Sequence, residues 1–142
     1  MATKYRGYRA ALARNTTGST YVTVASVLEM GEPGSTREMI DVTGHGDEWK
    51  DFLSGAQEGT EFQMRLAYDP ADAQHIAVKT DYDAGTVKKY HLTHPDITGA
   101  NTGLEISMVP VGWQAGAPMD GAYTATANFK IVNPGVVLIT TP

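Results

Sequence analysis

Polar and apolar residues alternate cleanly along residues 60–69 of the chain. Phe62, Met64, Leu66 and Tyr68 occupy every second position, and the positions between them are polar. Because successive side chains of a strand point to opposite faces of a sheet, this stretch predicts a half-buried strand. Runs rich in β-branched and aromatic residues predict further strands over residues 20–30, 39–43, 86–93, 104–113 and 122–132.

A first short helix is predicted over residues 47–55. Asp47 can cap it, because a carboxylate accepts hydrogen bonds from the free N–H groups of a helix start and favours the positive end of the helix dipole. Trp49, Phe52 and Leu53 then share one face, and a glycine ends the helix. The Gly-His-Gly before Asp47 is interpreted as a turn, since adjacent His and Asp rarely form a catalytic pair.

A second short helix is predicted over residues 70–83. Pro70 would stand at its first position, where a missing N–H is tolerated, and Gly85 would end it. Residues 31–38 are rich in Gly, Pro and Ser and predict a loop.

Together these elements predict an α+β, mainly β fold: an antiparallel β-sandwich or barrel-like domain with one or two short flanking helices. A length of 142 residues suits one domain. We expect a basic N-terminal arm at residues 1–20, a β domain at 21–135 and a C-terminal tail at 136–142. The expected structural core includes Trp49, Phe52, Phe62, Tyr68 and Phe129.

Charge is distributed unevenly along the chain. Residues 1–20 contain Lys4, Arg6, Arg9 and Arg14 and no acid, so the remainder holds seven basic against sixteen acidic residues. A basic arm beside an acidic body is suited to head-to-tail contact between copies, although a solvated terminus would look the same. The exposed edges of a small sheet also favour contact between copies, because a neighbouring chain can pair with them.

No residue pattern indicates catalysis, a cofactor or a metal site. The chain has no cysteine, which excludes a disulfide framework and a cysteine nucleophile. His91 and His94 are three positions apart and would face opposite ways on a strand, so they form a poor metal pair. No apolar run approaches the length of a membrane helix, and we expect no membrane anchoring.

Several segments, taken in order, resemble the tail tube proteins of long-tailed, siphovirus-type bacteriophages or of phage-derived gene-transfer particles. They are the Glu-Met-Gly-Glu-Pro-Gly turn at 29–34, Ile-Asp-Val-Thr at 40–43, the aromatic–Gly segment at 49–55, the strand at 61–70 that runs into Asp-Pro, and the last strand at 121–135.

The resemblance implies the tail-tube fold and a structural protein, not an enzyme. Copies would assemble into stacked hexameric rings, forming a hollow, non-contractile tube through which DNA passes. The implied partners are further copies, a tape-measure protein, tail terminator and distal tail proteins, and DNA in transit. The protein would be made in the bacterial host cytoplasm and end in the virion tail. An acidic lumen would repel the phosphates of a passing duplex.

Candidate residues follow from this resemblance together with the polar positions. The polar face of the strand over residues 60–69 supplies lumen candidates, namely Glu61, Gln63 and Asp69. Candidates for contacts within or between rings are Arg6, Arg9, Arg14, Glu32, Arg37, Trp113 and Asp120. Two alternatives remain open: a monomeric β-sandwich binding module, and the tube subunit of a related injection or gene-transfer machine.

Overall fold

A computed structural model describes residues 10–117, 121 and 123–141. In these residues the chain forms nine strands and one helix. The strands are β1 (Ala11–Thr17), β2 (Thr20–Thr23), β3 (Val27–Met30), β4 (Ser35–Asp41), β5 (Phe52–Gly59), β6 (Glu61–Ala67), β7 (Lys88–Thr93), β8 (Gly99–Gly116) and β9 (Thr124–Thr141). The helix is α1 (Ala73–Ala84).

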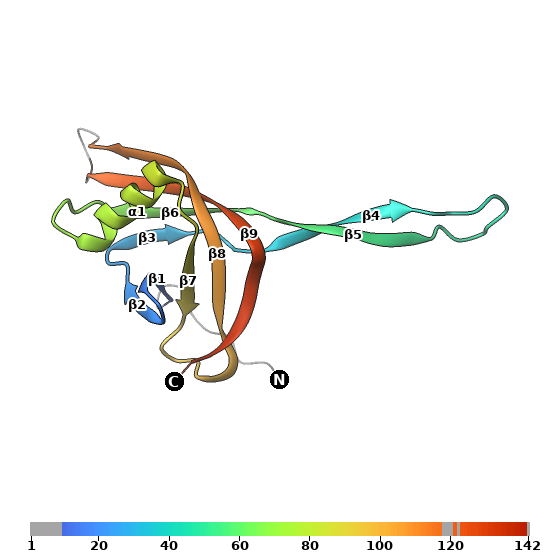
Figure 1. Ribbon diagram of the computed structural model, residues 1–142, viewed down its shortest axis with the longest axis horizontal. Helices are drawn as coiled ribbons and strands as arrows, with labels where there is room; N and C mark the ends of the chain where they lie inside the picture. The colour runs from blue at the N-terminus through green and yellow to red at the C-terminus, as the bar shows by residue number, and fades with distance from the viewer. Residues whose placement is uncertain (1–9, 118–120, 122, 142) are drawn as a thin grey trace.

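Seven strands form one antiparallel sheet in the order β2-β1-β7-β8-β9-β6-β3. The two longest strands, β8 and β9, have 18 residues each and curve through the whole body of the molecule. β4 and β5 form a separate two-stranded sheet, a hairpin that projects far from the body (Figure 1). The mainly β, antiparallel fold is confirmed, with one helix, and the sheets do not close into a barrel.

The core lies on one face of the seven-stranded sheet, beneath α1. Phe62 pairs in register with Phe129, and Met64 with Ala127, and all four side chains are fully buried. Val78 of α1 is buried against this face. The predicted strand over residues 60–69 is confirmed as β6, with its alternation intact. Its polar positions form part of the opposite face, which we call the bare face.

Asp72 determines where α1 begins. Its carboxylate accepts hydrogen bonds from the backbone N–H groups of Gln74 and His75, which makes it the N-cap. Pro70 therefore precedes the cap, and its predicted place in the first turn is wrong. Gly85 ends the helix with φ 68°, a left-handed conformation that glycine adopts at low cost.

A buried histidine joins this helix to the chain before β3. His75 Nδ1 accepts a hydrogen bond from the Asp69 N–H at 3.1 Å, so Nε2 carries the proton and donates to the Ala25 carbonyl at 2.7 Å. Beside Ala25, Ser26 has φ 60° and breaks the strand predicted over residues 20–30 into β2 and β3.

A buried ion pair joins α1 to β1. Arg14 Nε donates to Asp81 Oδ2 at 2.8 Å, Arg14 Nη2 lies 2.6 Å from the same oxygen, and both side chains are nearly inaccessible to solvent. Arg14 was expected at a subunit contact, and this is wrong. Its position on β1 opposite Tyr90 turns the guanidinium inward, beneath the helix.

The helix predicted over residues 47–55 does not form. β5 begins at Phe52, which pairs with Asp41, and Leu53 pairs with Ile40. Cross-strand pairing therefore overrides the helical spacing of the aromatic residues. Trp49 is 83% exposed and Phe52 47% exposed, so neither belongs to the core, whereas Phe62 and Phe129 do. Tyr68 is partly buried and packs against the core.

Both ends of the described chain take part in the large sheet. Within the segment expected as a basic arm, β1 pairs with β2 and β7. Within the segment expected as a tail, β9 continues to Thr141 and Leu138 pairs with Leu104 of β8. The segment predicted as a loop at residues 31–38 becomes strand β4 from Ser35 onward.

The ion pair between Arg14 and Asp81 yields a stability prediction. Arg14→Met leaves the Asp81 carboxylate buried without its partner, and we expect it to lower the free energy of unfolding by about 3–5 kcal/mol. The double variant Arg14→Met, Asp81→Leu removes both charges and should recover most of the loss. Urea unfolding followed by circular dichroism measures both; equal losses in the single and double variants would contradict the prediction.

Candidate assembly surfaces

The hairpin of β4 and β5 is held at its base by a group of contacts with the large sheet. The Thr60 N–H and hydroxyl both donate to the Gly34 carbonyl, at 3.0 and 3.1 Å, and the Ile131 N–H donates to the Thr60 carbonyl at 3.2 Å. Lys130 Nζ on β9 lies 3.2 Å from Glu58 Oε1. The hairpin is therefore tied to β9 through the β5 side of its base, where Thr60 and Glu58 meet Ile131 and Lys130.

Gly59 is the position at which the hairpin passes closest to β9. A Cβ atom there would lie 2.1 Å from the Ile131 carbonyl oxygen and 2.7 Å from its carbon. Because these are backbone atoms, no side-chain movement could relieve the clash. Glycine is needed here for close backbone approach.

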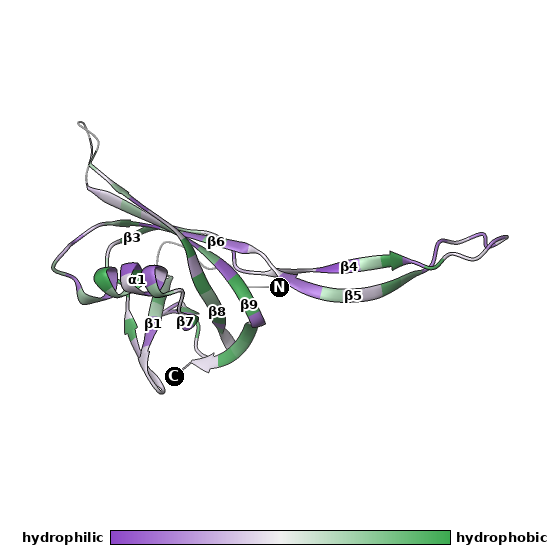
Figure 2. Ribbon diagram, turned by 45° about the horizontal axis from the view of Figure 1, so that its top comes forward, coloured by the Kyte–Doolittle hydropathy of each residue, from purple (hydrophilic) through white to green (hydrophobic). Residues whose placement is uncertain are grey.

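The outer end of the hairpin is defined here as residues 39–53. Ile40 pairs with Leu53, and Phe52 with Asp41, so apolar side chains lie on both faces of this ribbon. Figure 2 shows the same apolar bands toward the far end of β4 and β5. The exposed apolar side chains, with their exposed fractions, are Met39 57%, Ile40 46%, Val42 46%, Trp49 83%, Phe52 47% and Leu53 58%. An exposed apolar cluster of this kind is typical of interaction surfaces.

The tip of the hairpin is acidic and internally hydrogen-bonded. Asp47 Oδ2 accepts from the Gly44 N–H at 2.7 Å, which closes the turn in place of the helix cap expected from the sequence. Asp41 accepts from the Thr43 N–H at 2.9 Å. Hydrogen bonding from the Thr43 side chain and backbone lowers the pKa of Asp41. Asp51 donates its N–H to the Thr43 hydroxyl at 3.0 Å.

The bare face carries two of the three lumen candidates. Glu61 and Gln63 are exposed on β6, beside Lys130 and Asn128 of β9. Asp69 is exposed too, but it lies beyond the end of β6 and accepts a hydrogen bond from the Ala71 N–H at 2.9 Å in the turn before α1. The structure therefore groups Glu61 with Gln63 and separates Asp69 from them.

Acidic and basic side chains alternate on this face. Glu29 pairs in register with Arg65, and Glu61 with Lys130. Further along, Glu105 Oε1 lies 3.5 Å from Lys89 Nζ. The expected acidic wall is therefore balanced by bases on neighbouring strands, because the register places each acid opposite or beside one.

A cluster that the sequence did not predict lies on the same face. His91 Nε2 is 3.1 Å from Glu105 Oε2, and the His91 ring stacks on Tyr21 with centroids 3.6 Å apart. His94 is instead buried in the otherwise exposed turn after β7, so the two histidines are not brought together. Metal-ligating groups of three or more His, Cys, Asp or Glu do not occur among the residues that the structure describes.

The other contact candidates are scattered. Glu32 is exposed in the turn before β4, and Arg37 is exposed on β4 with its Nη1 donating to the Gly55 carbonyl at 3.0 Å. Trp113 is partly buried and packs edge-on against Tyr68. Arg6, Arg9 and Asp120 lie outside the described residues.

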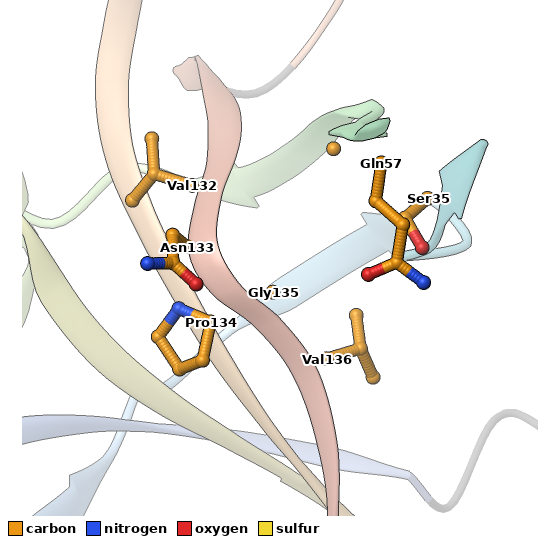
Figure 3. Close-up of a pocket in the computed structure, with 8 residues that line it drawn as sticks. Ser35, Gln57, Val132, Asn133, Pro134, Gly135 and Val136 are labelled. Atoms are coloured by element: carbon orange, nitrogen blue, oxygen red, sulfur yellow. The ribbon is translucent and has the colours of Figure 1, made fainter. Parts of the chain in front are cut away.

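Two cavities border the long strands. The first, of about 360 Å³, lies between the hairpin base and the bend of β9 (Figure 3). Ser35 and Gln57 line one side, Asn133 and Pro134 the other, and the edge of β9 continues past it without a partner strand among the described residues. The second, of about 340 Å³, lies where β1 begins and β9 ends; we call it the rim cavity. It is lined by Ala11, Thr93, His94, Pro95, Ile97, Thr98 and Thr141.

Tyr90, on β7, is fully buried. Burial raises the pKa of Tyr90 above its ordinary value, opposed by the positive charge of Arg14, and the residue serves the core. α1, the helix in the described part of the chain, is too short and too polar to cross a membrane.

Comparison with known proteins identifies the fold. No family model and no curated protein sequence matches the chain. Among solved structures, a chain from the tail of an empty gene transfer agent particle, solved with C6 symmetry, superposes with a TM-score of 0.78 at 14% identity, covering 96% of this chain and 100% of that one. The SPP1 tail tube superposes with a TM-score of 0.78 at 10% identity, covering 96% of this chain and 80% of that one.

A third similar structure comes from a contractile system. The sheath/tube terminator of an extracellular contractile injection system superposes with a TM-score of 0.71 at 9% identity, covering 96% of each chain. These likenesses show that the chain has the tail-tube fold, as the order of sequence segments predicted.

Gly59 yields a prediction about the hairpin. Gly59→Ala places a methyl group against the Ile131 backbone, and we expect it to lower the free energy of unfolding by about 1–3 kcal/mol and to change the hairpin direction. Gly116→Ala is the matched control, because a Cβ there meets no atom within 4 Å. Thermal unfolding and small-angle scattering measure the two effects; identical behaviour of both variants would disprove the close packing.

Proposed function

We propose that this protein is a tail tube subunit. Its copies form hexameric rings that stack into a hollow, non-contractile tube through which DNA passes. The observation that carries this proposal is the projecting hairpin, which exposes apolar side chains on both faces of its outer end. Such a surface is unfavourable in water and is covered when copies assemble. The likeness to a tail solved with C6 symmetry supports the six-fold arrangement.

The large sheet supports the same proposal. One face is covered by α1 and the core, while the bare face is polar and exposed. The outer edges of β2 and β3, and that of β9 beyond Ile131, lack partner strands among the described residues. Neighbouring copies in a ring can pair with such edges and continue the sheet from subunit to subunit. The bare face then lines the lumen, with Glu61 and Gln63 toward the DNA.

The remaining partners and the location follow from this role. A tube of this kind is built around a tape-measure protein and ends on terminator and distal tail proteins. The assembled protein belongs to the virion tail and is made in the cytoplasm of the bacterial host. The likeness to a contractile injection system favours a second candidate, the tube of a related injection or gene-transfer machine. A monomeric binding module would use the exposed apolar end of the hairpin to bind a different protein, whereas the likeness to tube structures favours contact between copies.

Electron microscopy of the purified protein tests the proposal. We expect six-fold rings or tubes at high protein concentration. Phe52→Ser with Leu53→Ser removes apolar contact area from the hairpin but no core packing, since both side chains are about half exposed, so the variant should fold and fail to form tubes. Ile76→Ser, which changes an exposed apolar residue of α1, is the control. Wild-type particles that stay monomeric at every concentration would refute the proposal.

The lumen assignment has its own test. Glu61→Lys changes an exposed residue of the bare face and leaves a cluster of bases beside Lys130, so phosphates of the passing duplex should be held there. We expect normal tubes by microscopy but slower DNA delivery, with the delay decreasing as salt is added. If tube formation itself fails, Glu61 lies instead at a contact between subunits.

A further inference from the structure

The acidic residues of the chain are spread unevenly over the molecule. Residues 32–58, which include the hairpin of β4 and β5, contain seven acids and two bases. Residues 69–85, which include α1, contain four acids and one base. These two regions hold the excess negative charge of a chain whose net charge is −5. The bare face of the large sheet has a different balance.

Four neighbouring strands form the part of the bare face that carries Glu61 and Gln63. They are β3, β6, residues 124–131 of β9 and residues 109–116 of β8, and we call them the wall strands. The charged residues in these ranges are Glu29, Glu61, Arg65 and Lys130, two acids and two bases. The wall strands are therefore neutral, although the chain as a whole is acidic.

The strand register sets each acid of the wall strands against a base. Glu29 lies opposite Arg65, and Glu61 lies opposite Lys130. Side chains that face each other across an antiparallel pair are about 5 Å apart. The fields of such alternating charges cancel beyond roughly that spacing, whereas the field of a wholly acidic wall extends over a Debye length of about 10 Å at 0.1 M salt.

The other polar residues on this face of the wall strands are uncharged. Gln63 lies opposite Asn128, and Gln114 lies opposite Thr126. Amide and hydroxyl groups exchange hydrogen bonds with water at little net gain in free energy. They therefore give a passing phosphate neither a fixed charge to bind nor one to avoid.

We propose that Arg65 and Lys130 make the lumen wall neutral, so that the tube neither holds nor repels the polyanion that passes through it. This inference rests on the proposed function, in which the bare face lines the lumen. Without the two bases, Glu29 and Glu61 would leave the wall acidic. An acidic wall admits DNA more readily as salt is added, and a basic wall holds it at low salt. A neutral wall makes passage insensitive to salt.

The pair of Glu29 and Arg65 allows a matched test, because both side chains are exposed and lie opposite each other. Glu29→Gln makes the wall of each copy positive by one charge, and Arg65→Gln makes it negative by one. The double variant is neutral again. Assembled tubes are incubated with a short fluorescent DNA duplex at about 20 mM and about 200 mM salt and sedimented, and the duplex in the pellet is measured.

The two single variants should shift in opposite directions. Wild-type tubes and the double variant should carry equal amounts of duplex at both salt concentrations. Glu29→Gln tubes should carry about fivefold more at low salt, because the affinity of one phosphate contact falls nearly in proportion to salt. Arg65→Gln tubes should carry less at low salt than at high salt. Asp83→Asn adds the same charge on α1, away from the bare face, and should behave as the wild type.

The outcomes separate this proposal from the proposed function. Wild-type tubes that exclude the duplex at low salt and admit it at high salt have an acidic wall and overturn the neutral one. Single variants that both match the wild type overturn it too, because Glu29 and Arg65 then do not face the lumen. A double variant that fails to restore the wild-type result contradicts the pairing. In each of these cases the tube function stands, whereas a wild-type protein that forms no tubes overturns both proposals.

Discussion

The antiparallel ladder between β8 and β9 is the interaction on which the rest of the structure depends. It runs from the pair Gly99–Thr141 to the pair Gly116–Thr124, with three register shifts that allow the strands to bend. β7 and β1 are added on one side, and β6 and β3 on the other. Because both strands curve together, they define a covered face beneath α1 and a bare face opposite it.

This asymmetry between the two faces explains why the chain suits assembly. The covered face has aromatic and aliphatic pairs such as Phe62–Phe129, together with the buried pair of Arg14 and Asp81, and is complete within one molecule. The bare face, the free strand edges and the hairpin, by contrast, leave surfaces that nothing in the described part of the same chain covers. A monomer would leave half-exposed apolar residues such as Phe52 and Leu53 in water, whereas a stack of identical copies can cover them.

The hairpin has a base held by close packing and hydrogen bonds, and an outer end with exposed apolar side chains. Gly59 and the hydrogen bonds of Thr60 fix the direction in which it leaves the sheet, so its end is presented at a defined place. A preorganised arm loses little conformational freedom when it binds. The charges on the bare face are balanced, because Glu61 lies beside Lys130 and Glu29 beside Arg65. In the proposed tube such a face would be polar without strong attraction for phosphate.

The sequence alone determined the elements whose signals are local. Alternation at period two predicted β6 and its buried residues, and turn chemistry placed the end of α1 at Gly85, because these patterns need only near neighbours. The order of segments indicated the tail-tube fold. Only the tertiary structure decided whether a residue is buried or exposed where this depends on partners far away in the sequence. Trp49 and Phe52 have helical spacing, yet strand pairing across the hairpin exposed them. The sequence indicated that Arg14 lies at the surface. In the structure it is buried, because it forms an ion pair with Asp81, which is 67 positions away in the chain.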